Sequence, residues 1–262
     1  MGAACSSGTV NAPPVTLEPL PFQLRRDAAD LIPHGEVCEF EVSWHIFTMG
    51  TIVFEAQRRP GHPHGDLHLR STTTPTRLAA ALSKFGGVAD SYLHSESFSP
   101  QSYEWLSPTV KNRKRRLNWF DNDRVRSLEM SAMSWEGETF PDRWAHDPLS
   151  VLYLLRVAEL SLNQEIRVIV VEGTKRRLAT IRRGAEEILR RGRREPPINV
   201  IRYGLRMDKI VDSNAVDIEA EVDQNVLISA DSTRSIVRAE GLIRGQPIVI
   251  NLKKRWIADQ AP

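Results

Sequence analysis

The sequence lacks long hydrophobic runs and a large net charge of either sign. No stretch of about 18 or more apolar residues occurs in the 262-residue chain, so the sequence predicts no membrane-spanning helix. The 35 basic and 33 acidic side chains leave a formal net charge of +2, which supplies no overall field to hold the chain on nucleic acid or on an anionic membrane. We therefore expect no nucleic-acid partner unless a local patch binds one.

The short motifs that identify common enzymes are also missing. The chain has no Gly-x-Ser-x-Gly elbow, no phosphate-binding loop and no dinucleotide fingerprint. Five aspartates stand singly at predicted turns and caps, where carboxylates bond to backbone N–H groups; they are Asp121, Asp123, Asp142, Asp147 and Asp231. We assign no catalytic residue, expect no cofactor, and predict that the protein is not an enzyme.

Cysteine is scarce, and one of the two occurs near the amino terminus. Cys5 follows the small residues Gly2-Ala3-Ala4, as at the end of a bacterial lipoprotein signal, and precedes a stretch rich in Pro, Thr and Asn. We predict a flexible tether over residues 1–30, with lipid attached at Cys5. No apolar signal segment precedes it, so the start lies upstream, the signal was removed, or the match is accidental. Gly2 and Ser6 alternatively fit an N-myristoylation pattern.

Residues 36–57 carry the strongest structural signal, because apolar side chains recur at every second position. The predicted buried face comprises Cys38, Phe40, Val42, Trp44 and Ile46. The predicted opposite face comprises Glu39, Glu41, Ser43 and His45. A break at Met49-Gly50 indicates a glycine turn or bulge between two antiparallel strands. The sequence thus predicts a sheet with one apolar side and Cys38 as a buried core thiol.

Further alternating segments predict more strands than helices. Predicted strands cover 66–73, 88–96, 111–121, 124–133, 165–171, 175–183, 186–190, 199–207, 225–229, 234–240 and 248–254. One predicted helix covers 76–84 and stops at Gly86-Gly87. A second is capped by Asp147, has Pro148 at its first position, and runs to about Leu160. We predict one β-rich domain over residues 31–258.

Three segments stand out in order along the chain: Gly35-Glu36 through Gly50, Asp147-Pro-Leu-Ser-Val-Leu-Tyr-Leu-Leu-Arg156, and Leu227-Ile-Ser-Ala-Asp231 through Gly245. In this order they resemble a bacterial envelope family, the domain of unknown function 3108. The resemblance spans about Pro33 to Leu252. It implies an exported protein of the periplasm or cell envelope, with a strongly curved antiparallel sheet, a half-barrel wrapped around two short helices, similar to lipoprotein carrier folds. It transfers no catalytic residue.

Two polar clusters could bind a ligand, but each has a simpler explanation. His62, His64 and His68 offer imidazoles for a divalent metal. We interpret their segment as a solvated hairpin loop and predict no metal site. The basic residues of 111–116, beside Trp119, could grip phosphates, but strand alternation divides them between two faces. The second basic run, 190–194, precedes two prolines and is interpreted as an exposed turn.

The remaining hypothesis is a binding protein. A concave sheet lined with aromatic side chains suits an apolar ligand. We predict that the ligand-binding side chains are Phe40, Val42, Trp44, Phe54, Trp119 and Trp135. The expected function is non-catalytic binding of an envelope lipid, lipoprotein or polysaccharide, with peripheral membrane association through the lipid anchor. A membrane-anchored structural or protein-binding module is the alternative, and a hydrolase is third.

Overall fold

The computed structural model describes most of the chain from Phe22 to Ala258. The described residues are 22–25, 28, 30–62, 65–82, 86–107, 114–121, 123–131, 134–142, 144–192, 195–212, 215–217, 223–243 and 246–258. Residues 1–21 of the predicted tether, with Cys5, lie outside this part. Within the rest of the predicted tether, Gln23–Leu24 form a short strand and Ala28 is buried.

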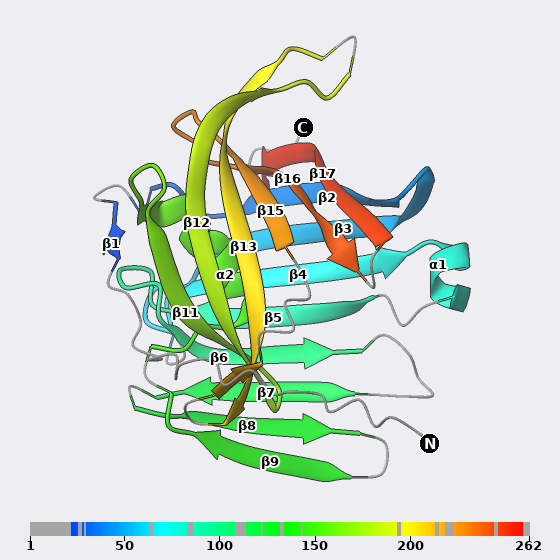
Figure 1. The fold of residues 1–262 in the computed structure, drawn as a ribbon. Coiled ribbons are helices and arrows are strands. Elements are labelled where there is room, and N and C mark those ends of the chain that lie inside the picture. Colours follow the sequence, from blue (N-terminus) through cyan, green and yellow to red (C-terminus); the bar gives the residue numbers. More distant parts are fainter. Residues whose placement is uncertain are drawn as a thin grey trace, which may run out of the picture.

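A large antiparallel sheet dominates the molecule (Figure 1). Its strands are β2 Glu36–Trp44, β3 Phe47–Arg58, β4 Leu67–Pro75, β5 Gly87–Leu93, β6 Pro100–Leu106, β7 Arg115–Phe120, β8 Val125–Met130, β9 Trp135–Phe140, β11 Glu165–Glu172, β12 Lys175–Leu189, β13 Ile198–Asp212, β14 Ala215–Asp217, β15 Asp223–Ser229, β16 Ile236–Ile243 and β17 Gln246–Ile257. The order is β11-β12-β13-β15-β16-β17-β2-β3-β4-β5-β6-β7-β8-β9, with β14 paired to β13. The path ends at β11 and β9, so the sheet is curved but not closed. A separate two-stranded sheet pairs β1 Gln23–Leu24 with β10 Ala158–Glu159.

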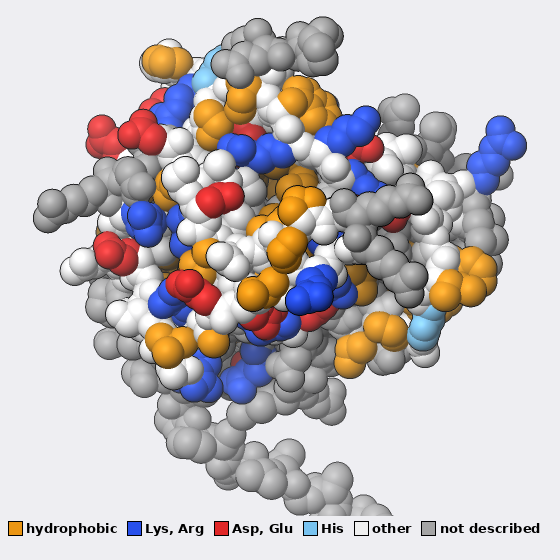
Figure 2. All heavy atoms as spheres, turned by 90° about the horizontal axis from the view of Figure 1, so that it is seen from above, with side chains coloured by type: hydrophobic (Ala, Val, Ile, Leu, Met, Phe, Trp, Pro, Cys, Tyr) orange, Lys and Arg blue, Asp and Glu red, His pale blue; other side chains and the backbone are white. Residues whose placement is uncertain are grey.

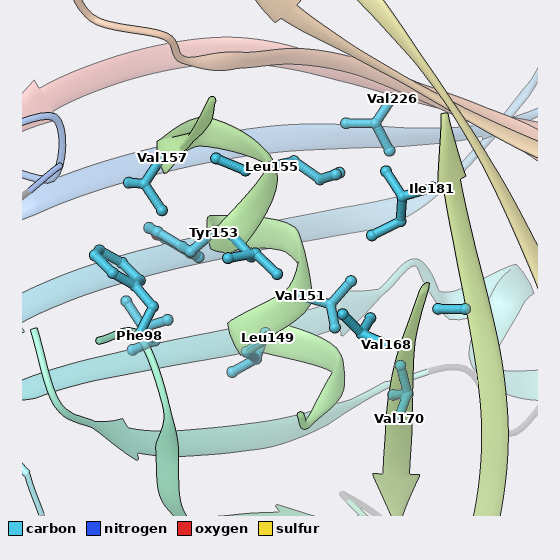
Figure 3. Close-up of a cluster of buried hydrophobic side chains, with 14 of the residues drawn as sticks. Phe98, Leu149, Val151, Tyr153, Leu155, Val157, Val168, Val170, Ile181 and Val226 are labelled. Carbon is cyan, nitrogen blue, oxygen red and sulfur yellow. The ribbon is translucent and has the colours of Figure 1, made fainter. Parts of the chain in front are cut away.

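The helix α2, Pro148–Val157, lies inside the curve of the sheet (Figure 1). It packs against β4 and β5 on one flank and β11 on the other. Val151 points towards Val168 and Val170 of β11, while Phe98 lies on the other side of the helix (Figure 3). Eight of its ten residues are buried, as expected of a helix enclosed by a sheet rather than lying on its surface.

The first hairpin confirms the predicted alternation but moves the turn. Cys38, Phe40 and Val42 are buried on one face of β2. Ile46 is not on that face, because the chain already turns at His45, whose φ is 52°, and Ile46 is 90 % exposed. The predicted interruption is a bulge in β3, where Val42 pairs with Gly50 and Ser43 with Thr48. A Cβ on Gly50 would lie 2.3 Å from the Thr74 carbonyl oxygen, so glycine is required there.

The other predicted strands and helices agree with the structure in type more often than in length. The segments 175–183 and 186–190 form one continuous strand, β12, which absorbs its interruption as a bulge between Arg183 and Glu186. β6 and β9 were not predicted. The helix predicted over 76–84 is reduced to six residues, α1 Arg77–Leu82, and residues 83–85 lie outside the described part. The last three residues of the second predicted helix leave the helix, and two of them pair with β1.

Side-chain and backbone hydrogen bonds join the two arms of the open sheet at the β11–β12 turn. The fully buried Asn118 of β7 accepts a hydrogen bond from the Gly173 N–H (2.8 Å) and donates one to the Gly173 carbonyl (2.9 Å). Arg116 of β7 also donates to Glu172 (2.7 Å). This Asn118–Gly173 contact closes the half-barrel where no strand ladder does.

The outer face of β15 and β16 is covered by a second, smaller cluster. Val200, Leu227 and Val237 are buried there, against Leu189, Ile198 and Leu252. The β12–β13 hairpin extends beyond the rest of the sheet (Figure 1). Seen from above, basic and acidic side chains are interspersed over the surface, in keeping with the small net charge (Figure 2). No described helix is long and apolar enough to cross a membrane.

Candidate functional site

A cavity of about 360 Å³ lies between α2 and the two flanks of the sheet. Strands β3 to β6 contribute Phe54, Ser71, Thr73, Gly87, Ala89, Tyr103 and Trp105. Strands β11 to β13 and β15 contribute Val170, Glu172, Arg177, Leu205, Met207 and Gln224. The first half of α2 contributes Pro148, Leu149, Val151 and Leu152. The volume is at the lower end of the ~300–1,000 Å³ of small-molecule sites, and the walls are mostly apolar.

The lining follows from strand alternation and from small residues in the middle of the wall. Ser71, Ala89 and Gly87 occupy inward positions where larger side chains would fill the space. Gly87 has a φ of +148° and its missing Cβ would meet the Trp105 ring at 2.9 Å. The indole of Trp105 therefore lies against backbone, and the cavity remains open between this wall and α2.

One end of the cavity is polar. Glu172 accepts a hydrogen bond from Arg116, whose guanidinium also lies 4.8 Å from the centre of the Trp105 ring. Arg116 further contacts Glu129 at 3.4 Å. Burial, followed by the nearby negative charge of Glu172, raises the pKa of Tyr103 above its usual value, so its hydroxyl is neutral. None of these groups is arranged as a nucleophile with an adjacent base.

The predicted ligand-binding residues fall in different places. Phe54 lines the cavity, and Phe40 packs edge-on against it with ring centres 5.3 Å apart. Val42 is buried in the main core, while Trp44 is half-buried at the end of β2, opposite Ile248. The other two predicted ligand-binding residues are Trp119 and Trp135.

Trp119 does not line the cavity. It lies between Asn118 and Phe120, which are buried, so its side chain points to the other face of β7. Trp135 begins β9, but its side chain lies outside the described part. Trp105, which lines the cavity together with Tyr103, belongs to β6, one of the two strands that the sequence analysis missed. The alternation of Tyr103 and Trp105 was the signal that could have located it.

The helix begins at a buried cap, as predicted. Asp147 accepts hydrogen bonds from the backbone N–H groups of Leu149 (2.8 Å) and Ser150 (2.9 Å), and from the Ser91 hydroxyl (2.7 Å). Its neighbour His146 pairs in parallel with Val170 on the edge of β11. Burial raises the pKa of Asp147 and lowers that of His146 to about 4, so the imidazole is neutral.

The helix ends at a buried group of charges. Arg156, 2 % exposed, forms an ion pair with Glu36, which is fully buried. Arg255 donates a second charged hydrogen bond to Glu36 (2.8 Å). Arg234 donates to the carbonyls of Arg156 (2.6 Å) and Leu155 (3.1 Å). Carbonyls at a helix C-terminus carry partial negative charge, which offsets the excess of arginines over carboxylates.

The three segments that resemble the domain of unknown function 3108 family meet at this group. Glu36 belongs to the first segment, Arg156 to the second, and the Thr233 and Arg234 carbonyls, which accept from Arg156 at 3.2 and 2.9 Å, belong to the third. Because Arg156 of the second segment bonds to the first and to the third, there is a physical reason for these residues to occur together. Membership of the family stays a prediction.

Cys38 is buried beside these charges. Burial, followed by the negative charge of Glu36, raises the pKa of its thiol to about 12. It is a protonated core residue, as predicted.

Among the described residues, the side chains of the two polar clusters make contacts within the protein. His62 and His68 both stack on Tyr92, with ring centres 5.1 and 4.4 Å away, so the tyrosine ring separates them. No group of three or more metal-ligating side chains occurs in the described part of the chain. His64 lies outside that part. In the first basic run, Lys114, Arg115 and Arg116 all form ion pairs with glutamates, and 111–113 lie outside the described part.

In the second basic run, 190–194, Arg191 donates to the Leu252 carbonyl (3.2 Å) and pairs with Glu195 (3.1 Å). Arg190 is exposed, as predicted for a turn, and 193–194 lie outside the described part.

The five aspartates considered for catalysis have structural partners. Asp121 and Asp123 lie near Arg126 and Arg124, Asp142 pairs with Arg176, and Asp231 accepts from Ser229 and Thr233. The described residues do contain one His–Asp contact, between His68 Nε2 and Asp90 (2.7 Å). It lies on the face of β4 and β5 opposite the cavity, since the adjacent Leu69, Ser71 and Ser91 point inward.

Comparison with known proteins places the fold but no activity. No family model matches the sequence, and no curated protein matches it. A beta-barrel-like protein of domain of unknown function 1849 from Brucella abortus has a TM-score of 0.50 at 8 % identity, over 85 % of this chain and 97 % of that one. A candidate exported protein with a YmcC-like fold from Bacteroides fragilis gives 0.35 at 9 % identity, over 86 % and 96 %. The first similarity shows a shared β-barrel-like fold; the second is too remote to argue from.

Proposed function

We propose that this protein binds an apolar or amphipathic component of the bacterial cell envelope without transforming it. The observation that carries the proposal is the cavity between α2 and the sheet, whose apolar lining includes Phe54, Trp105 and Met207. Each Å² of apolar ligand surface removed from water contributes ~25 cal/mol. Such a site needs no catalytic group. Export and a lipid anchor at Cys5 are part of the proposal and rest on the amino-terminal motif.

The test fills the cavity with one side chain. Thr73 is an inward residue of β4 that lines the cavity, and its neighbour Thr72 points to the opposite face. We expect Thr73→Trp to abolish lipid retention, because the indole occupies the space of the ligand, whereas Thr72→Trp leaves retention unchanged. Native mass spectrometry of each protein, purified from its own envelope, measures the bound lipid. If the wild type carries none and takes up none from extracted lipids, the proposal is wrong.

A membrane-anchored module remains the second candidate, and an exposed apolar tip favours it. At the β2–β3 turn, Ile46 is 90 % and Phe47 53 % exposed. This turn lies beside the β16–β17 strands, since His45 Nε2 is 2.9 Å from Gln246 Oε1, and Leu242 is also exposed there. Aromatic and aliphatic side chains of this kind insert at the boundary between lipid headgroups and acyl chains.

Vesicle sedimentation distinguishes the two. Under the second candidate, Ile46→Asp weakens association with phospholipid vesicles several-fold, while Thr73→Trp does not. Under the cavity proposal, Ile46→Asp leaves the bound lipid in native mass spectra unchanged. If Ile46→Asp loses the bound lipid while Thr73→Trp keeps it, the second candidate is favoured.

A further inference from the structure

One end of the cavity is lined by two charged side chains, Arg177 and Glu172. Along the inward faces of β12 and β13, paired residues form successive layers: Ile181 with Leu205, Ala179 with Met207, and Arg177 with Lys209. The first layer is buried and apolar, and the last is half-buried Arg177 beside exposed Lys209. The inward face of this hairpin therefore changes from apolar to basic in one direction, and of the two basic residues Arg177 lines the cavity.

Arg177 is the cation in this layer that lacks an opposing charge. Its partners in the strand register are Val170 and Lys209, so no acid lies directly across from it. The carboxylate that also lines the cavity, Glu172, is 2.7 Å from Arg116. Within the described residues, the Arg177 guanidinium makes no ion pair and no side-chain hydrogen bond.

A guanidinium at the polar end of an apolar cavity matches an anion at the end of an acyl chain. Arginine presents paired N–H groups that bind a carboxylate or phosphate in a bidentate manner. We take the volume of one methylene as ~30 Å³, the volume of a water molecule in the liquid. The 360 Å³ of the cavity then corresponds to about a dozen carbons. This size matches one chain better than the two or three chains of a phospholipid or mature lipoprotein.

We propose that the cavity binds a single-chain amphiphile with an anionic carboxylate or phosphate head, and that Arg177 binds that head while the chain lies against Trp105 and Met207. This inference rests on the proposed function and specifies the ligand class for the same site. A neutral or cationic head would leave the guanidinium unpaired at the cavity mouth.

Matched twelve-carbon probes test the head group separately from the chain. Isothermal titration below the critical micelle concentration at pH 8 compares dodecanoate, dodecyl phosphate, dodecanol and dodecyltrimethylammonium. We expect the two anions to bind about tenfold or more tightly than dodecanol, and the cation to bind most weakly. Dodecanoate tighter than dodecyl phosphate indicates a fatty acid as the source, and the reverse order indicates a lipid phosphate.

Variants on one strand assign the preference to Arg177. Arg177→Gln should lower the affinity for both anions about tenfold and leave dodecanol unchanged, while Arg177→Lys retains part of the preference. The control is Arg182→Gln, an exposed arginine on the opposite face of β12, which should change nothing. Circular dichroism confirms that each variant is folded.

The outcomes separate the two hypotheses. If no twelve-carbon probe binds the wild type, the proposed function fails together with the inference. If dodecanol binds as tightly as dodecanoate, or if Arg177→Gln weakens dodecanol and dodecanoate equally, the cavity binds chains but the anionic head group is wrong.

Discussion

Arg156, near the end of α2, connects the helix to distant segments through its buried guanidinium. Its guanidinium donates to Glu36, to the Leu31 carbonyl (2.7 Å) and to carbonyls of the 233–234 turn. Burial alone would lower the pKa of Arg156, but the charge and hydrogen bonds of Glu36 outweigh this effect and raise the pKa above its usual value. The arginine is therefore charged. A buried ion pair of this kind is compensated only while both partners are present.

We predict that Arg156→Met lowers the free energy of unfolding by about 3–5 kcal/mol, because it leaves Glu36 with one partner and several buried carbonyls with none. Arg255→Met is the control, since Arg255 binds the same carboxylate but is 26 % exposed and solvent replaces its contact. Its expected cost is about 1 kcal/mol or less. Urea unfolding measures both. Equal losses in the two variants would contradict the assigned role of Arg156.

At the scale of elements, α2 is fixed to the sheet at its beginning as well as its end. The His146 N–H donates to the Ile169 carbonyl (2.7 Å), and the Val171 N–H donates to the His146 carbonyl (2.8 Å). The residue before the helix cap thus extends the free edge of β11. The imidazole is carried into the interior, near the Ser150 hydroxyl at 3.3 Å.

This burial predicts a pH dependence. Below its ordinary pKa of 6.5, His146 takes a proton in the unfolded chain but stays neutral in the folded protein until about pH 4. The unfolded state therefore binds more protons, and stability falls as the pH drops from about 6.5 to 4, by up to about 3 kcal/mol. The raised pKa of Asp147 acts in the opposite direction, because the folded state takes up that proton more readily.

A variant isolates the histidine contribution. His146→Gln cannot be protonated, so its unfolding free energy should fall less between pH 6.5 and 4 than that of the wild type. Asp147 is present in both proteins and its effect cancels in the difference. Parallel stability curves for the two proteins, measured by urea unfolding at several pH values, would show that His146 is not the source.

At the scale of the whole molecule, a side-chain contact joins β7 to the turn that follows the terminal strand β11. Asn118 uses its amide oxygen on the Gly173 N–H and its amide nitrogen on the Gly173 carbonyl and the Ser127 hydroxyl (2.6 Å). Gly173 has a φ of +58°, and a Cβ there would lie 2.9 Å from Arg116. The contact therefore requires an amide side chain at position 118 and glycine at position 173. The contact holds Glu172, and with it the polar end of the cavity, in place.

We expect Asn118→Ala to lower the free energy of unfolding by about 2–3 kcal/mol, because it leaves buried backbone and hydroxyl groups without partners. Hydrogen exchange in the 172–174 turn should become faster, while exchange in β2 and β3 stays slow. Asn199→Ala, at an exposed position on β13, should stay within about 0.5 kcal/mol of the wild type. Unchanged exchange at 172–174 would show that the contact does not hold the turn.

The elements with an apolar face could be predicted from the sequence, because burial on one face imposes a period of two on a strand. β2 and β3 were predicted for this reason, and α2 was predicted from Asp147 and Pro148 at its start. β9 lacks the signal: four of its residues, Glu136 to Thr139, are exposed. The position of the first turn was missed because the sequence alternation continues to Ile46 although the chain has already reversed at His45.

The sequence by itself determined the mainly β architecture, the buried thiol of Cys38 and the capped helix, since these depend on neighbours within a few positions. The tertiary structure alone decided that this helix lies within the sheet, that Arg156 meets Glu36, and that Asn118 meets Gly173, 55 residues away. It also placed Trp105, Met207 and Arg177 around one cavity. Strands far apart in the chain have to curve around the helix before these side chains face each other, and local alternation carries no information on that curvature.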